Sequence, residues 1–212
     1  MINTLRGDAH SRERNNVSGA DRARRENVPK AHSFMSGDYE RKSEMWYVMQ
    51  VRTGSEENIK IQCERTVSDN ILERCFIPYY EERRHLKGNW TTIRRILFPG
   101  YVFLITEYVE ELYQQLKCVL GMTKILGSGG EIVPLSVDEV NFLERIGGEE
   151  QLVEMSEGVI EGGQVRIYQG PLQGMEGQVK KIDRHKRKAW LEIRMFGRMQ
   201  LMQVGLEIVE KR

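Results

Sequence analysis

The amino-acid sequence predicts an α+β fold, in which an antiparallel sheet with helices on one face comes first and a small β-barrel follows. Two patterns support this prediction. Residues 45–148 alternate short runs of β-branched and aromatic residues with segments whose apolar residues recur every three or four positions. From residue 159 onward, apolar and polar residues alternate one by one between glycine-marked turns, which is typical of many short strands. Residues 149–158 follow neither pattern, and we expect a linker there.

Residues 1–44 carry no pattern of either kind. They are rich in Arg, Asn, Ser, Gly and Ala, and their few apolar residues are too scattered to form a buried face. We therefore expect a disordered extension. Because the pattern of an ordered domain begins abruptly at Met45 and Trp46, we also raise the hypothesis that translation starts at Met45.

The first expected strand covers residues 45–51, where β-branched and aromatic residues are dense. A helix is expected to follow it. Ser55 stands where a side chain can cap that helix, and two glutamates follow in its first turn. Ile59, Cys63 and Val67 then recur at every fourth position, so they predict one buried helical face.

A β-hairpin is expected next. Its two strands are predicted at residues 75–80 and 91–97. The segment between them, residues 81–89, is highly charged and ends in Gly88 and Asn89, which favour a turn. We therefore expect a charged, mobile tip on this hairpin.

The rest of the first domain follows a break at residues 98–100. A buried strand is expected at residues 101–105, because all five residues are apolar or aromatic. A third helix is expected to begin at a capping box formed by Ser136 and Glu139 and to stop at residues 147–148, which are both glycine. The second helix, which lies between these elements, places the following residues on one apolar face: Val109, Leu112, Tyr113, Leu116 and Val119.

The charges are distributed unevenly along the chain. Residues 1–44 contain nine Lys or Arg and seven Asp or Glu, residues 45–158 contain 12 and 18, and residues 159–212 contain 11 and six. The formal net charge of +1 thus conceals an acidic middle and a basic end. We expect the two parts to bind different partners, with the basic end facing phosphate or another acidic surface.

The composition disfavours several classes of protein. No segment approaches the ~18 consecutive apolar residues of a membrane span, and no signal sequence opens the chain. The three cysteines, Cys63, Cys75 and Cys118, form no CxxC pair, so we expect reduced, buried thiols in a cytoplasmic protein without a zinc site. The four histidines are scattered and no nucleophile motif is present, so we expect neither catalysis nor a cofactor.

The segment 180–188 is strongly basic, with six Lys or Arg and one His. It falls where a loop should join two barrel strands, and such a cluster binds nucleic acid by contacting phosphates and releasing counterions. It suits double-stranded RNA, which proteins recognise through shape, phosphates and 2′-hydroxyls. A solvated loop without a ligand remains the alternative. The candidate RNA-binding residues are Lys181, Arg184, His185, Lys186, Arg187, Lys188 and, beyond the segment, Arg198.

The string ILFPGYVFL at residues 96–104 follows the charged hairpin and precedes VLGMTKILGSGGEIVPLSVDEV. In order and spacing, these segments resemble the N-terminal domain of the NusG family of transcription elongation factors, and WYV at residues 46–48 is similar to the start of its first strand. The segments GQVRI, GPL, GMEG and FGR within residues 163–198 resemble a KOW domain. The resemblance covers residues 45–212. It implies a four-stranded antiparallel sheet with flanking helices and a five-stranded SH3-like barrel, in an adaptor without enzymatic activity.

The resemblance also implies roles for two regions of the first domain. In the family, the aromatic residues on either side of the bend at 99–100 dock on the clamp helices of RNA polymerase. The alternative, that these rings complete the domain core, stays open. By the same analogy the hairpin tip reaches the opposite side of the polymerase cleft, with a solvated loop as the alternative. The candidate polymerase-binding residues are Phe98, Tyr101, Arg83, Arg84 and His85.

The KOW-like part bears on which kind of NusG protein this is. General bacterial factors typically carry Phe where this chain has Leu172, whereas Phe196 is retained, and these two residues are the candidate contacts to a protein partner. A basic, RNA-binding KOW domain resembles the LoaP group of specialised paralogs, in which this domain recognises a hairpin in the nascent leader RNA and promotes antitermination. We therefore expect a monomer that binds RNA polymerase and such an RNA hairpin, and no membrane.

Two other functions stay open. One is a general elongation factor whose KOW domain binds a termination factor or a ribosomal protein; the basic segment and Leu172 favour the specialised paralog over it. The other is a ribosome-associated RNA-binding protein, since ribosomal proteins share the KOW glycine pattern. The segment at residues 96–104 argues against this second alternative.

Overall fold

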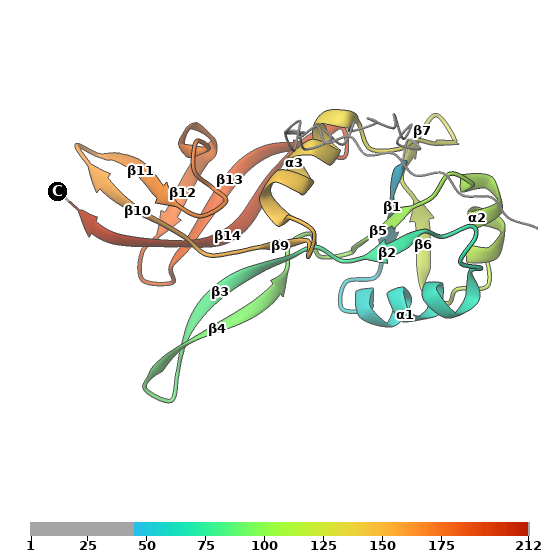
Figure 1. Ribbon diagram of the computed structural model, residues 1–212, viewed down its shortest axis with the longest axis horizontal. Helices are drawn as coiled ribbons and strands as arrows, with labels where there is room; N and C mark the ends of the chain where they lie inside the picture. The colour runs from blue at the N-terminus through green and yellow to red at the C-terminus, as the bar shows by residue number, and fades with distance from the viewer. Residues whose placement is uncertain (1–44, 212) are drawn as a thin grey trace, which may run out of the picture. The chain divides into compact units, whose positions relative to one another are not determined.

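A four-stranded antiparallel sheet lies at the centre of the N-terminal domain, as predicted (Figure 1). The computed structural model describes residues 45–211, so the expectations for residues 1–44 lie outside the described residues. The strands follow the order β2–β5–β1–β6, and the central strands β1 and β5 are buried along most of their lengths. Their bounds are Arg74–Phe76 for β2, Tyr101–Ile105 for β5, Trp46–Val51 for β1 and Met122–Ile125 for β6.

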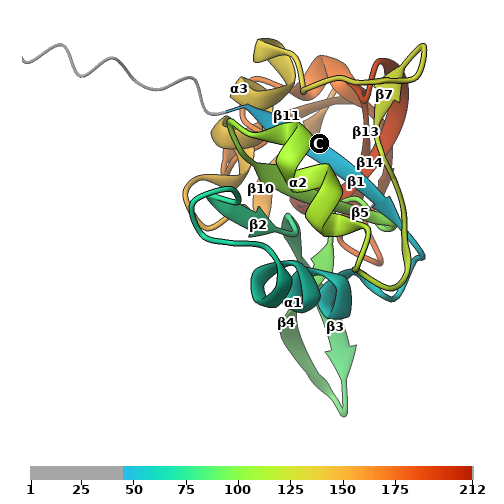
Figure 2. The ribbon, with the colours of Figure 1, turned by 90° about the vertical axis from the view of Figure 1, so that its right-hand side faces the viewer.

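Helices cover both faces of this sheet, whereas the sequence analysis expects them on one. The helices are α1 (Glu56–Thr66), α2 (Val109–Leu116) and α3 (Val137–Gly147). Helices α1 and α2 share a core with Tyr47 and Met49 of β1 and lie together on one side of the sheet (Figure 2). Helix α3 instead shares a core with Trp46 and Val48. Since successive residues of a strand point to opposite faces, four consecutive large apolar residues require that both faces be covered.

The starts of the helices match the predicted capping signals in part. Ser136 and Glu139 form the predicted capping box of α3, in which the Ser136 N–H donates to the Glu139 carboxylate at 2.9 Å. Ser55 precedes α1, but its side chain makes no capping hydrogen bond. Instead the buried carboxylate of Glu56 accepts the backbone N–H of Gly100 at 2.7 Å. This bond ties α1 to the bend that follows the hairpin.

Two expectations about buried residues are wrong. Tyr113 is 37% exposed, because the buried face of α2 consists only of Leu112 and Leu116. Cys118 is also exposed, since it follows the end of the helix. The other two cysteines are buried as expected, and all three are free thiols.

The hairpin of β3 (Tyr79–Leu86) and β4 (Asn89–Ile96) is longer and more regular than predicted (Figures 1 and 2). The segment expected as a mobile tip is mostly strand, and the turn contains only Lys87 and Gly88. Their φ angles are 47° and 88°. Two consecutive positive φ angles form a tight turn whose twist matches the flanking strands, so the pairing continues up to the turn. The predicted strand 75–80 is divided between β2 and β3.

Five strands form the C-terminal β-rich domain, as predicted. They follow the order β11–β10–β14–β13–β12, and every adjacent pair is antiparallel except β10 and β14. Alternate residues such as Leu191 and Ile193 of β13 and Met202 and Val204 of β14 face the core. The bounds are Ser156–Glu161 for β10, Gln164–Gln169 for β11, Val179–Asp183 for β12, Lys188–Met195 for β13 and Arg198–Lys211 for β14.

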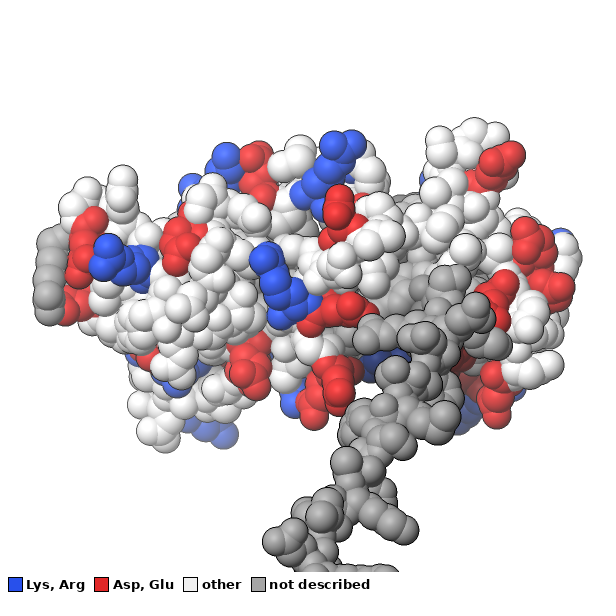
Figure 3. Space-filling model, turned by 45° about the horizontal axis from the view of Figure 1, so that its top comes forward, with Lys and Arg blue, Asp and Glu red and all other residues white. Residues whose placement is uncertain are grey.

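The segment expected as a linker, residues 149–158, is partly strand. It contains β9, which pairs in parallel with β3, and the first residues of β10. The smaller elements are β7 (Gly127–Ser128), β8 (Glu131–Ile132), β9 (Leu152–Val153) and the 3-10 helix Glu176–Gln178. No helix within residues 45–211 is long and apolar enough to cross a membrane. On the face drawn in Figure 3, Lys and Arg lie interspersed with Asp and Glu.

Candidate functional site

A tight cationic turn, Arg184–Lys186, follows β12. The carboxylate of Asp183 accepts the backbone N–H of Lys186 at 2.9 Å, and this hydrogen bond lowers the pKa of Asp183. Arg187 closes the turn with a positive φ of 53°. The side chains of Arg184, His185 and Lys186 are all exposed. Three of the predicted RNA-binding residues are therefore presented together to solvent on an ordered turn.

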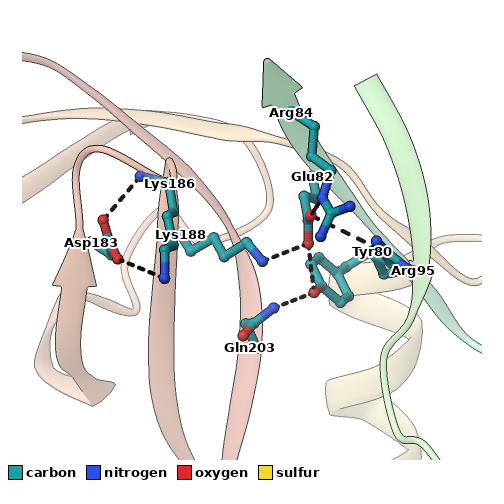
Figure 4. A network of polar contacts seen from close by, with 8 residues as sticks. All are labelled: Tyr80, Glu82, Arg84, Arg95, Asp183, Lys186, Lys188 and Gln203. Atoms are coloured by element: carbon teal, nitrogen blue, oxygen red, sulfur yellow. Dashed lines mark hydrogen bonds and ion pairs between the residues drawn. The ribbon is translucent and has the colours of Figure 1, made fainter. Parts of the chain in front are cut away.

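The next two cations of the same segment are held by other residues, and Figure 4 shows the contacts of the second, Lys188. The guanidinium of Arg187 pairs with the carboxylate of Glu207 at 3.0 Å and lies 3.6 Å from the centre of the Trp90 ring. The ammonium of Lys188 is 2.7 Å from a carboxylate oxygen of Glu82. The two basic side chains are only 20% and 15% exposed. Because Trp90 and Glu82 belong to β4 and β3, the hairpin covers one side of the basic segment.

Glu82 is a buried carboxylate whose neighbours keep it charged (Figure 4). Its side chain is 2% exposed, and it accepts hydrogen bonds from Arg84 at 2.7 Å and from the Tyr80 hydroxyl at 3.1 Å. Burial by itself raises the pKa of Glu82, but the hydrogen bonds from Lys188 and Arg84 outweigh burial and leave the pKa lowered. Burial also raises the pKa of Tyr80 to about 12, so its hydroxyl stays protonated as a donor.

The hairpin approaches the C-terminal domain so closely that a glycine is needed. A Cβ atom at Gly205 would lie 2.4 Å from the carbonyl oxygen of Glu81, which is closer than Cβ atoms come in real proteins. Strand β14 can therefore pack against β3 only because residue 205 has no side chain. The amide of Gln203 also donates to the Tyr80 hydroxyl across this contact. We call it the hairpin interface, formed by β3–β4 on one side and by residues 187–188 and β14 on the other.

An aromatic cluster joins the two domains at the other end of β13. Phe196 lies in the turn between β13 and β14, where its φ is 56°. Its ring centroid lies 5.5 Å from that of Phe98, 4.7 Å from that of Tyr101 and 6.0 Å from that of Phe103. Phe98 is 5% exposed, so the candidate polymerase-binding ring is covered in this conformation by the candidate partner-binding ring.

Two of three further candidate residues, Arg198 and Leu172, lie away from the positions that their proposed roles need. Arg198 donates to the hydroxyl of Tyr101 at 3.2 Å. It therefore lies at the aromatic cluster, eight strand residues away from the cationic turn, and does not extend that turn as expected. Leu172 is fully buried in the core of the C-terminal domain and is not a surface contact for a partner. Lys181 lies over the ring of Trp190, 4.9 Å from its centroid.

The hairpin residues expected as a free basic tip have partners in the structure. Arg83 forms an ion pair with Glu207, and Arg84 bonds to Glu82 while keeping 51% of its side chain exposed. The ring of His85 meets the ring of Trp90 edge-on at 5.3 Å between centroids. These contacts exist because strand pairing reaches the turn and holds the side chains to defined sides of the hairpin.

Three residues that organise the site are not predicted from the sequence: Glu82, Trp90 and Glu207. A local signal exists for Glu82, because it alternates with the buried Tyr80 along β3. An acidic residue at an inward position requires cationic partners. That rule does not identify which cation is the partner, because Lys188 is more than a hundred residues away along the chain.

Comparison with known proteins finds relatives along most of the chain. A family model described as "Transcription termination factor nusG" matches residues 44–144. Proteins named "Transcription termination/antitermination protein NusG" from Staphylococcus carnosus (strain TM300) and Staphylococcus aureus (strain Mu50) are each 32% identical over 174 residues, which cover 78% of this chain and 94% of the relative. The solved structure "Domain interaction in Thermotoga maritima NusG" is similar with a TM-score of 0.52 and 26% identity, over 78% of this chain and 94% of that one.

Proposed function

The chain belongs to the NusG family, and from this premise we propose that it is a specialised antitermination factor, binding RNA polymerase with its N-terminal domain and a nascent RNA hairpin with its C-terminal domain. Family membership makes it a transcription factor and not an enzyme. The cationic turn supports the RNA-binding half of the proposal, and the aromatic cluster supports the polymerase-binding half.

The exposure of the cationic turn is the observation that carries the proposal. Arg184, His185 and Lys186 project together from an ordered turn, so little backbone order has to be created when they meet phosphates. Each phosphate contact releases condensed counterions and strengthens binding in a salt-dependent way. The domain around the turn is also basic, with 11 Lys or Arg against six Asp or Glu in residues 159–212. A compact cationic turn suits the phosphates and 2′-hydroxyls of an RNA stem.

The polymerase half of the proposal rests on Phe98 and Tyr101. Both flank a bend that Glu56 fixes through the N–H of Gly100. Two aromatic rings at the centre of a protein contact can each contribute about 2 kcal/mol or more to binding. In the structure Phe196 covers them, so polymerase can reach this site only after Phe196 leaves it.

Holding both ligands on one chain gives the factor its advantage. Once the N-terminal domain is on the polymerase, the C-terminal domain is confined near the emerging transcript. Its effective concentration toward an RNA hairpin is then far higher than that of the free domain in solution. Moderate affinity at the cationic turn is therefore sufficient for selective capture of a leader RNA.

The experiment that tests the proposal is RNA binding by the full chain. The R184Q/K186Q double variant should lose most of its affinity for a structured leader RNA, and the slope of log affinity against log salt should fall by about 1 to 2. The matched control is K124Q/R166Q, which removes two exposed cations elsewhere. If the R184Q/K186Q variant bound structured RNA as tightly as the control variant does, the turn would be only a solvated charge cluster. The same conclusion would follow if neither variant distinguished structured from single-stranded RNA.

A general elongation factor is the second candidate function. The relatives carry both termination and antitermination in their names. On this view the C-terminal domain binds a protein and not RNA, and Phe196 contributes to that contact after it leaves the aromatic cluster. Binding that is weak and equal for all RNAs would favour this function.

A further inference from the structure

The cationic turn is only half of the basic segment, because the hairpin interface hides the other half. We propose that RNA binds the face of the C-terminal domain that the β3–β4 hairpin now covers, so that RNA and hairpin compete for Arg187 and Lys188. This inference rests on the proposed RNA-binding function and adds where the RNA lies and what it must displace.

The hairpin offers this face the same two kinds of chemical group that RNA offers. Glu82 places a carboxylate oxygen 2.7 Å from the Lys188 ammonium, where a phosphate oxygen would make the same contact (Figure 4). Trp90 places its ring 3.6 Å from the Arg187 guanidinium, where an unpaired base would stack in the same way. An anionic oxygen and a flat ring at adjacent residues make the hairpin an internal substitute for RNA.

The same face of the sheet continues beyond these two cations. Lys188 pairs across the ladder with Asp183 and with Gly205, and Trp190 pairs with Lys181 and with Gln203. Lys188 and Trp190 therefore point to the same outer side of β13, because alternate residues share a face. With Lys181 stacked on Trp190, this side offers further cation and aromatic surface next to the cationic turn. An RNA that spanned the whole surface would have to remove β3 from β14.

Removal of the hairpin would also affect the other end of β13. The same C-terminal domain that carries the RNA face carries Phe196, which covers Phe98 and Tyr101. A ligand that separates the domains at the hairpin interface therefore favours uncovering the aromatic cluster. By thermodynamic reciprocity, a partner that binds the uncovered rings raises the affinity for RNA by the same factor.

The test is the affinity of the full chain for a synthetic RNA stem–loop, measured for W90A and E82Q. Both variants weaken the hairpin interface and leave every cation of the C-terminal domain in place. In the open state the hairpin has left the C-terminal domain. If this state makes up about a tenth of the population, variants that populate it fully raise the apparent affinity for RNA by up to ~10-fold. W90F keeps an aromatic ring under Arg187 and should bind as the natural chain does.

Two variants serve as matched controls. Y108A removes an aromatic side chain that is 46% exposed, against 44% for Trp90, and lies at the start of α2 in the N-terminal domain. E64Q removes one negative charge from α1, where Glu64 pairs with Lys60. Neither should tighten RNA binding. In the W90A background, K188Q should weaken binding more than K180Q, because Lys180 pairs with Glu192 and is already 52% exposed.

Each outcome decides whether RNA and the hairpin compete for Arg187 and Lys188. Tighter binding by W90A and E82Q supports it. Weaker binding by W90A would overturn it, because the hairpin would then be part of the RNA surface, and unchanged binding by both variants would also overturn it. In either of the last two cases, the proposed RNA-binding function still stands if R184Q/K186Q loses affinity. If that double variant keeps its affinity, the proposed function fails as well.

Discussion

The two ends of β13 join the C-terminal domain to the N-terminal domain by different physical means. At its first residue, Lys188 forms an ion pair with the buried Glu82 of the hairpin. Just beyond its last residue, Phe196 packs among the rings of Phe98 and Tyr101. The first contact is a buried ion pair, which salt screens only weakly, and the second is apolar.

This difference shows how one interface can respond to two kinds of ligand. An ionic contact can be exchanged for phosphates, whereas an aromatic contact can be exchanged for an apolar protein surface. The carboxylate of Glu82 at one end of β13 therefore resembles the phosphates of RNA, and the aromatic rings at the other end resemble the apolar surface of a protein partner. Variants that weaken one end and not the other test whether the two ends are separate in this way.

The largest effect is expected from E82Q. The free energy of unfolding should fall by about 3 kcal/mol, because Lys188 and Arg84 would face a buried site without a counter-charge. Denaturation by urea measures this loss, which should change little with salt because both charged groups are largely buried. The control E64Q breaks an exposed pair with Lys60 and should cost about 0.3–0.5 kcal/mol. Equal losses for the two variants would contradict the buried ion pair.

A somewhat smaller effect is expected at the other end of β13. F196A should lower the free energy of unfolding by about 2 kcal/mol, because it removes ring contacts with Phe98, Tyr101 and Phe103. The same urea titrations measure it. Y168A, which removes an exposed ring, is the control. A loss no larger than that of Y168A would contradict the packing of Phe196 among the other rings.

The close approach of the strands gives the third prediction. G205A should cost about 1–2 kcal/mol, since its Cβ would meet the carbonyl oxygen of Glu81 at 2.4 Å. G177A is a matched control, because nothing lies within 4 Å of a Cβ at Gly177. Thermal unfolding of the two variants compares them directly. If both shifted the midpoint equally, β14 would not pack against β3 as the structure shows.

The smallest effect is a difference in acid sensitivity. The pKa of Glu82 is lowered from its ordinary value of 4.5, so its charged form stabilises the fold. That contribution is complete above the ordinary value and is lost as the pH falls through the lowered pKa. The natural chain should therefore lose more unfolding free energy than E82Q when the pH falls from neutral to below 4.5. Parallel pH profiles of the two proteins would show that Glu82 is not the group responsible.

Much of the fold could be predicted from local sequence. The apolar run at residues 46–49 identifies a buried strand, and the Ser136–Glu139 pair identifies the start of α3. The sequence underestimates the length of the paired strands in the hairpin. The reason is that Lys87 is not a residue type that usually adopts positive φ, so its sequence does not indicate a two-residue turn. Helices on both sheet faces were missed because periodicity shows that a residue is buried but not what buries it.

The sequence alone determined which residues are basic, which are aromatic and where the strands that carry them run. It therefore identified the segment 180–188, Phe98, Tyr101 and Phe196 as candidates. Only the tertiary structure decided that the basic segment is divided into an exposed turn and a covered pair. That division depends on Glu82 and Trp90, which approach Lys188 and Arg187 only when β3 packs on β14. Local patterns report the burial of single residues, whereas contacts between distant segments depend on how domains dock.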